Sequence, residues 1–146
     1  MDGLTRGRDP MGRAGGYNDT VLDHYRNPRN VGEIPETAAV AQVGDAATGD
    51  VLRISLRIED GTVVEARFRS FGCTAAIAAG SMATVLVQGR PVDTAERLSN
   101  RDVVEALGGL PESKIGCSVL AEQAIRQALR HWREAAGRTA AETRCH

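Results

Sequence analysis

The chain has 146 residues, with 18 basic and 19 acidic side chains and a formal net charge of −1. This length predicts one domain with its own hydrophobic core, and the balanced charge gives no general attraction to nucleic acid or to an anionic membrane. With 3% aromatic residues, three cysteines and no apolar run of the about 20 residues that span a bilayer, we expect no nucleic-acid stacking surface, no membrane span and a reducing, cytoplasmic setting.

The two ends of the chain lack the patterns of regular structure. Residues 1–16 are rich in glycine and arginine and have no apolar periodicity, so they predict a disordered lead-in. A folded domain is expected over residues 17–135, opening with a short helix that stops at Asn27 and Pro28. A loop follows over residues 30–37. The polar segment 136–146 is predicted to be a flexible tail.

An alternating pattern marks the next part of the chain as a β-hairpin. Apolar and polar side chains alternate over residues 52–58, and the same period of two returns over residues 64–69. The residues 59–61, Glu-Asp-Gly, supply the turn between the two runs. A third strand is expected over residues 39–43, because two strands alone are marginally stable.

The pattern then changes to that of helices. Residues 73–87 are apolar on nearly all sides and predict a buried helix that lies across the sheet. Short helices are expected over 93–98 and 101–107, the second opened by Asn100. A long amphipathic helix is predicted over about 118–135. The expected fold is therefore α+β, with a three-stranded antiparallel sheet packed against a layer of helices and a long C-terminal helix.

Two cysteines stand where predicted helices begin. The unpaired N–H groups and partial positive charge at a helix start would stabilise a thiolate at Cys73 or Cys117 and lower its pKa, and Lys114 adds a nearby cation. Each cysteine is equally well explained as a small buried apolar residue. If these helix starts meet the strand that Asp50 opens, two sulfurs and a carboxylate would suit zinc or an iron–sulfur site.

Four stretches of the sequence resemble a known family. They are YNDTVLDHYRNPRNVGEI from residue 17, the GD at 49–50 with its hairpin, ARFRSFGCTAAIAAGS, and LPESKIGCSVLAEQAI. In this order and spacing they are similar to the IscU/NifU-type iron–sulfur cluster assembly scaffolds, a family that includes NifU N-terminal-like and SufU-like members. The resemblance implies a compact α+β domain in which Asp50, Cys73 and Cys117 bind iron, zinc or a [2Fe-2S]-type cluster.

Two positions depart from the ligand set of that family. Thr48 stands where the family has a cysteine, and Gly116 stands where it has a histidine. SufU-type members also lack the histidine, so the neutral hydroxyl of Thr48 is the more serious loss. Three ligands remain where a cluster takes four. The fourth stays open among solvent, a small thiol, a partner protein, a second subunit, and Cys145 or His146 of the tail.

Three functions follow from these residues. The first is a cluster scaffold or carrier that accepts sulfur from a cysteine desulfurase, binds iron and passes the cluster to an apo-protein. The second is a zinc-binding sulfur acceptor of SufU type, and the third is a non-catalytic adaptor with a degenerate cluster site. None of these is a conventional enzyme, although sulfur acceptance resembles a transferase step. The altered loop at 110–114 gives no reason to expect the chaperone binding of the family.

Other polar residues are expected to have structural or solvent-facing roles. His24 is predicted to be structural, and His131 is predicted to be solvated on the last helix. Four arginines of the hairpin should share one side and form a basic strip that faces an acidic partner or water. They are Arg53, Arg57, Arg67 and Arg69.

Overall fold

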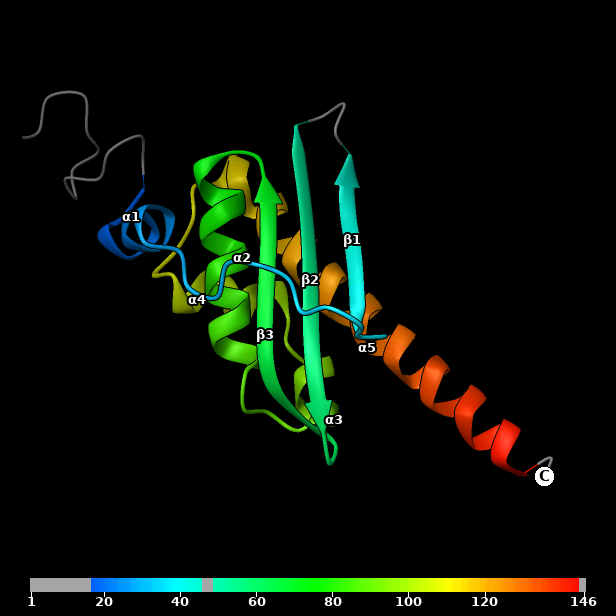
Figure 1. Cartoon of the computed structure of the whole chain (residues 1–146). Coiled ribbons are helices and arrows are strands. Elements are labelled where there is room, and N and C mark those ends of the chain that lie inside the picture. Colours follow the sequence, from blue (N-terminus) through cyan, green and yellow to red (C-terminus); the bar gives the residue numbers. More distant parts are fainter. Residues whose placement is uncertain (1–16, 46–48, 145–146) are drawn as a thin grey trace, which may run out of the picture.

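The computed structural model describes residues 17–45 and 49–144 of the chain. The elements in chain order are α1 (Asp19–Arg26), β1 (Val40–Asp45), β2 (Asp50–Glu59), β3 (Thr62–Phe71), α2 (Thr74–Val87), α3 (Val92–Glu96), α4 (Asn100–Ala106), the short 3-10 helix η2 (Glu112–Lys114) and α5 (Ile115–Arg144) (Figure 1). The expected α+β class is confirmed, and so are the three-stranded antiparallel sheet and the long C-terminal helix.

The sheet has the strand order β1-β2-β3, so β2 is central and the other two strands are edges. A tight turn joins β2 to β3, in which Asp60 has φ 53° and Gly61 has φ 74°. Two consecutive positive φ angles are those of the type I′ turn, whose twist matches that of the flanking strands. The Asp-Gly pair therefore sets the pairing next to the turn, and a bulge between Arg57 and Ile58 shifts the register by one residue over the rest of the hairpin.

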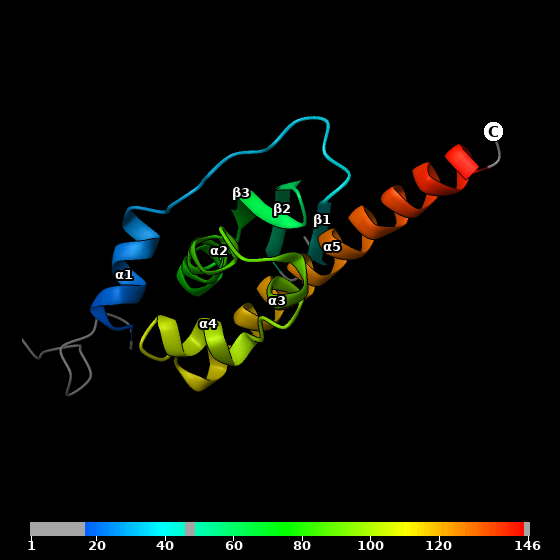
Figure 2. The same ribbon diagram turned by 90° about the horizontal axis from the view of Figure 1, so that it is seen from below.

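Helices cover one face of the sheet, and an irregular segment crosses the other (Figures 1 and 2). The covered face buries apolar side chains of the strands, among them Leu52, Ile54 and Leu56 of β2, in one core with Ile125 and Leu129 of α5. On the opposite face the segment 27–39 is held by the N–H of Ile34, which donates to Ser55 Oγ at 3.0 Å, and by Thr37 Oγ1, which donates to the carbonyl of Leu56 at 2.6 Å.

The apolar helix α2 lies close against the sheet, as its composition predicts. A Cβ atom at Gly80 would stand 2.8 Å from Phe68 Cδ2 and 3.0 Å from Leu52 Cδ1. Contacts this short leave no room for any side chain but hydrogen at this position. The glycine therefore sets how near α2 approaches the strands, and with it the position of the helix start at Cys73.

The helix α5 is longer than the sequence pattern predicts. It begins at Ile115 because η2 leads directly into it, and it continues past Ala135 to Arg144. The tail expected to be flexible is thus helical through Arg144, since residues 135–144 are mainly alanine and arginine, which favour helix, and contain no proline. This part of α5 projects beyond the sheet (Figure 1). Cys145 and His146 lie outside the described residues.

Two further expectations need correction. The helix α4 is capped by Ser99 rather than opened by Asn100: Ser99 Oγ accepts from the N–H of Asp102, and Asp102 Oδ2 accepts from the N–H of Ser99, which is a capping box. His131 is not simply solvated. Its Nδ1–H donates to the carbonyl of Val40 at 2.7 Å and ties α5 to strand β1.

His24 has the structural role that the sequence predicts. It is buried between α1 and α2, where its Nδ1 lies 2.8 Å from Ser81 Oγ. The same Ser81 oxygen accepts the N–H of Arg29 at 2.9 Å, so the hydroxyl proton is free to bond to the imidazole. Burial lowers the pKa of His24, and the nearby Arg29 lowers it further.

The predicted basic strip exists, but acidic residues neutralise it. Arg53 and Arg69 face each other across the strands and both form ion pairs with Glu33, a residue of the segment that crosses this face. Arg57 and Arg67 both pair with Glu65. The strip is therefore a network of mixed charge rather than a cationic surface. Across the described ranges, no helix combines the length and the apolar character that spanning a membrane would require.

Candidate metal centre

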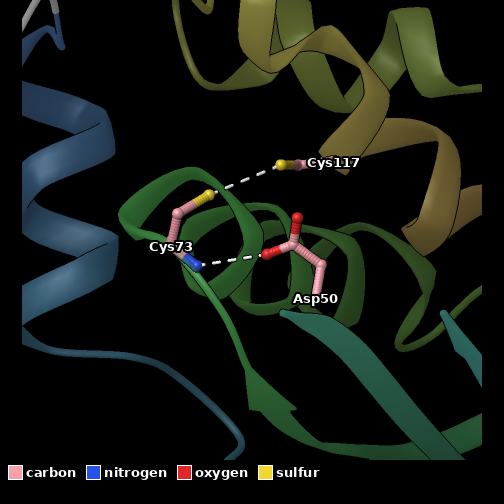
Figure 3. Close-up of side chains that lie close together, drawn as sticks. All are labelled: Asp50, Cys73 and Cys117. Carbon is pink, nitrogen blue, oxygen red and sulfur yellow. Dashed lines mark hydrogen bonds between the residues drawn. The ribbon is translucent and has the colours of Figure 1, made fainter. Parts of the chain in front are cut away.

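Three elements end or begin at one place near the top of the sheet (Figure 3). Asp50 is the first residue of β2, Cys73 is the N-cap of α2, and Cys117 lies in the first turn of α5. Figure 3 shows the two sulfur atoms and the carboxylate directed toward one another. The three residues predicted from the sequence as a site are therefore neighbours in space.

The geometry of the group is compact. One potential ligand atom of each residue lies within 4.8 Å of the others, and the Sγ atoms of Cys73 and Cys117 are 3.6 Å apart. The backbone N–H of Cys73 donates to Asp50 Oδ1 at 3.3 Å. That N–H belongs to the start of α2, so the carboxylate sits where the helix dipole favours negative charge.

Two glycines hold Asp50 in this position. A Cβ at Gly72 would collide with the Asp50 side-chain oxygen Oδ1, and a Cβ at Gly44 would collide with the backbone carbonyl of Asp50. Gly44 also has φ 103°, a conformation that L side chains rarely adopt. The chain therefore packs tightly around the backbone of Asp50 at Gly44 in β1 and around its carboxylate at Gly72, just after β3, and only glycine leaves room at these two positions.

The pKa of Cys117 is raised, whereas its place at a helix start predicted a lowered pKa and a thiolate. Its side chain is only 7% exposed. Burial is the largest of the causes that together raise the pKa of its thiol to about 12; hydrogen bonding to Cys73 and the negative charges of Cys73 and Asp50 also raise it, while Lys114 lowers it by a smaller effect. A position inside the first helical turn therefore does not produce a thiolate here, because the desolvation of the sulfur outweighs the attraction of the helix dipole and the lysine.

Tyr17, for which the sequence predicted no role in the site, packs beside the two thiols. Tyr17 and Leu110 pack against the small apolar cluster of Ala75, Ala76 and Cys117. Burial raises the pKa of Tyr17, and the two cysteines raise it further. The only sequence signal was its place just before the helix cap Asn18, which says nothing about the distant cysteines.

The donor atoms fit a metal ion of intermediate softness. Two thiol sulfurs and one carboxylate oxygen are common ligands of zinc, and thiolates also bind iron in iron–sulfur clusters. Gly116, next to Cys117, borders open space, since nothing lies within 4 Å of a Cβ built there. Thr48, Cys145 and His146 lie outside the described residues. Within the described part of the chain, this group therefore offers three potential ligands.

Comparison with known proteins finds a family and relatives that match most of the chain. A family model described as "NifU-like N terminal domain" matches residues 16–139. The "Iron-sulfur cluster assembly scaffold protein IscU 1" of Archaeoglobus fulgidus is 43% identical over 113 residues, which cover 77% of this chain and 74% of that protein. The IscU scaffold protein of Azotobacter vinelandii is 42% identical over 125 residues, covering 83% of this chain and 97% of that protein.

A solved structure supports the same fold. The crystal structure of a NifU-like protein (N-terminal) from Brucella abortus superposes with a TM-score of 0.62 at 21% sequence identity, covering 80% of this chain and 94% of that one. The fold agrees with that structure, and the family model spans most of the sequence. The chain belongs to the family of NifU-like N terminal domains.

Proposed function

We propose that this protein is an iron–sulfur cluster assembly scaffold. The observation that carries the proposal is the convergence of Asp50, Cys73 and Cys117 within 4.8 Å in a chain of the NifU-like family. The relatives from Archaeoglobus fulgidus and Azotobacter vinelandii are named as such scaffolds. The cluster is the cargo of this site, and we assign the three residues as its ligands.

The two thiols are suited to accept sulfur from a persulfide on a cysteine desulfurase. The thiol of Cys73 or Cys117, once it has lost its proton, would attack the outer sulfur of that persulfide, the sulfur–sulfur bond would break, and the donor cysteine would leave as a thiolate. The 3.6 Å between the sulfurs places the second thiol beside the first. A dithiol reductant would supply the two electrons that release this sulfur as sulfide and restore the thiol. Both cysteines would then hold the sulfide and iron, and an apo-protein would receive the assembled [2Fe-2S]-type cluster. The protein acts in this as a scaffold rather than as an enzyme.

A second candidate function is that of a zinc-binding sulfur acceptor. Two sulfurs and one oxygen leave one position of a tetrahedral zinc site open, the position at which an exchangeable ligand binds. In this function zinc would keep the thiols deprotonated until the desulfurase engages one of them. An adaptor with a degenerate site is the third candidate, and Thr48 is the residue that favours it.

We expect assembly to take place in the cytoplasm. Cys73 and Cys117 must both stay reduced to accept sulfur and bind iron, and a reducing compartment keeps neighbouring thiols in this state. The altered loop Leu110–Lys114 gives no support for a chaperone partner, so desulfurase and recipient proteins are the partners we propose.

Anaerobic reconstitution separates the three candidates. The purified chain is incubated with ferrous iron and sulfide, or with zinc, and then desalted; metal content and visible spectra are measured. Retained iron and sulfide with charge-transfer absorption support the scaffold, retained zinc alone supports the acceptor, and neither supports the adaptor. Cys73→Ser and Cys117→Ser should each abolish retention. The matched control Cys145→Ser tests whether the last cysteine contributes, and a loss in that variant alone would contradict our ligand assignment.

A further inference from the structure

The two edges of the sheet differ in how their backbone groups are satisfied. On β3, the N–H of Phe68 donates to the carbonyl of Asn30, and the carbonyl of Phe68 accepts from Gly32. The N–H of Ala66 donates to Gln88 Oε1 at 3.1 Å. Val63 exchanges hydrogen bonds with Gly89 and Arg90 in the same way. The edge of β3 is therefore closed by the chain itself, as edge strands of monomeric proteins usually are.

The opposite edge, on β1, is open. The N–H of Leu56 donates to the carbonyl of Ala39, and in an antiparallel ladder the groups of every second residue then face the partner strand. Val40, Gln42 and Gly44 consequently turn their N–H and C=O groups away from β2. The carbonyl of Val40 accepts from His131, whereas among the described residues no partner exists for the outward groups of Gln42 and Gly44, both of which are exposed.

A groove runs along this open edge. It has a volume of about 530 Å³ and lies between β1 and the polar side of α5. The residues that line it are Gln42, Val43, Gly44, Glu122, Gln123, Arg126, Gln127 and Arg130. Both walls offer groups that a peptide backbone or a polar side chain can bind, which is the layout of sites that accept an added β-strand.

The groove also holds a cation, Arg130, that has no counter-ion among the described residues. Arg126 pairs with Glu122 at 3.2 Å, and its Nε donates to the carbonyl of Glu96. Arg133 pairs with Asp93 and Glu96 nearby. Arg130 has no hydrogen bond or ion pair within the described part of the chain. A second cavity of about 360 Å³ extends the groove past Arg130 toward Glu96 and Arg133.

We propose that the β1 edge is a docking site for an extended, acidic segment of a partner protein. The segment would add a fourth strand by pairing with the outward groups of Gln42 and Gly44, and one of its carboxylates would bind Arg130. This surface is separate from the ligand atoms of Asp50, Cys73 and Cys117. It ends at Gly44, which pairs with Val51, the residue after Asp50, so a docked segment would end beside the metal centre.

Neither a second copy of this chain nor its own first residues match the charge of the groove. A second β1 strand has one acidic residue, Asp45 at its end, and is uncharged from Val40 to Gly44, so it offers less negative charge to Arg130 than an acidic segment does. Residues 1–16 contain three arginines but only two aspartates and would bring net positive charge to a cationic groove. An acidic segment from another protein satisfies both the backbone and the arginine.

Three synthetic peptides test the proposal against the full chain. The first is a fluorescein-labelled hexapeptide that alternates valine and glutamate, the second replaces glutamate by lysine, and the third is the acidic peptide with alternate N-methylated amides that cannot pair as a strand. Anisotropy titrations up to about 1 mM peptide, with amide NMR shifts to locate the site, should show binding of the first peptide alone, with shifts at Gln42, Val43 and Gly44.

Substitutions in the protein test the same contacts between the peptide and the β1 edge. Arg130→Glu should weaken binding by about fivefold or more, since an exposed ion pair is replaced by repulsion. The matched control Arg101→Glu, on an exposed arginine of α4, should leave it unchanged. Gln42→Pro removes an outward N–H, a change that edge strands tolerate, and should also abolish binding.

Several outcomes would overturn the proposal. These are no binding of the acidic peptide, equal binding of the lysine or N-methylated peptide, or NMR shifts elsewhere on the protein. Sedimentation velocity tests whether a second copy of the chain occupies this edge instead. A dimer that Gln42→Pro dissociates would show that it does.

Discussion

The Sγ atoms of Cys73 and Cys117 lie 3.6 Å apart, although 44 positions separate the two residues in the chain. Both belong to the starts of helices, α2 and α5, which pack against the same sheet. The two thiols are brought together because each helix is anchored by its buried face, not by any bond between the cysteines. Asp50 joins them from the first residue of β2.

Zinc binding should depend on pH through Cys117. Because burial, together with the hydrogen bond to Cys73 and the nearby negative charges, raises the pKa of this thiol to about 12, the group is protonated at neutral pH and must lose its proton to bind a metal. Zinc affinity is therefore expected to rise about tenfold per pH unit for each proton released. Competition titrations with a chromophoric chelator at several pH values measure this slope. A Cys117→Ser variant should show a shallower dependence, and an affinity independent of pH in the unmodified chain would contradict the assignment.

Restoring the family's first cysteine should strengthen the site. We expect Thr48→Cys to retain more iron and sulfide after reconstitution, because a thiolate is a far better ligand than a neutral hydroxyl and completes a set of four. Iron retained after desalting is the measurement. Thr94→Cys, on the exposed side of α3, is the matched control for an added thiol. If Thr48→Cys retains no more than the unmodified chain, the fourth ligand already comes from elsewhere.

The stability of the protein should fall in mildly acidic solution because of His24. Its pKa is lowered by burial, so the unfolded chain binds a proton that the folded chain does not. The stabilising effect is complete above the unfolded pKa of about 6.5 and is lost as the pH falls from there toward the lowered folded value. Asp23, whose pKa is lowered by its hydrogen bond to Arg29, changes the stability with pH only in more acidic solution.

Urea unfolding at a series of pH values measures this effect. His24→Gln should flatten the pH dependence in this window, and Ser81→Ala should lower the free energy of unfolding by about 1–3 kcal/mol, because it leaves the imidazole and the N–H of Arg29 without their partner. An unchanged pH profile in His24→Gln would show that another group titrates.

The close approach of α2 to the sheet predicts a strong effect of a single methyl group. Gly80→Ala should lower the free energy of unfolding by about 1–3 kcal/mol, since the new Cβ would stand 2.8 Å from Phe68 Cδ2 and push the helix away. Gly137→Ala is the matched control: it is also helical, and nothing lies within 4 Å of its Cβ. That variant should gain about 0.5–1 kcal/mol from helix propensity. Equal effects of the two changes would show that the contact is not decisive.

Local patterns were reliable guides to the elements of this fold. The alternation over residues 52–58 and 64–69 identified β2 and β3, and the Asp60-Gly61 pair identified their turn. Among the predictions that were wrong are the C-terminal end of helix α5 and the solvent exposure of His131. Helix α5 extends to Arg144 because nothing in the polar segment breaks a helix, and His131 is engaged because β1 passes beside it.

The sequence by itself determined the fold class and, through the resemblance, the residues to examine: Asp50, Cys73 and Cys117. It could not give the protonation of Cys117, because the pKa of a thiol depends on how much water its neighbours exclude, and those neighbours come from distant parts of the chain. The cover by Tyr17 and the open edge of β1 likewise depend on which segments meet after folding. Spacing along a chain sets local conformation, whereas burial, charge and free hydrogen-bonding groups are set by packing in three dimensions.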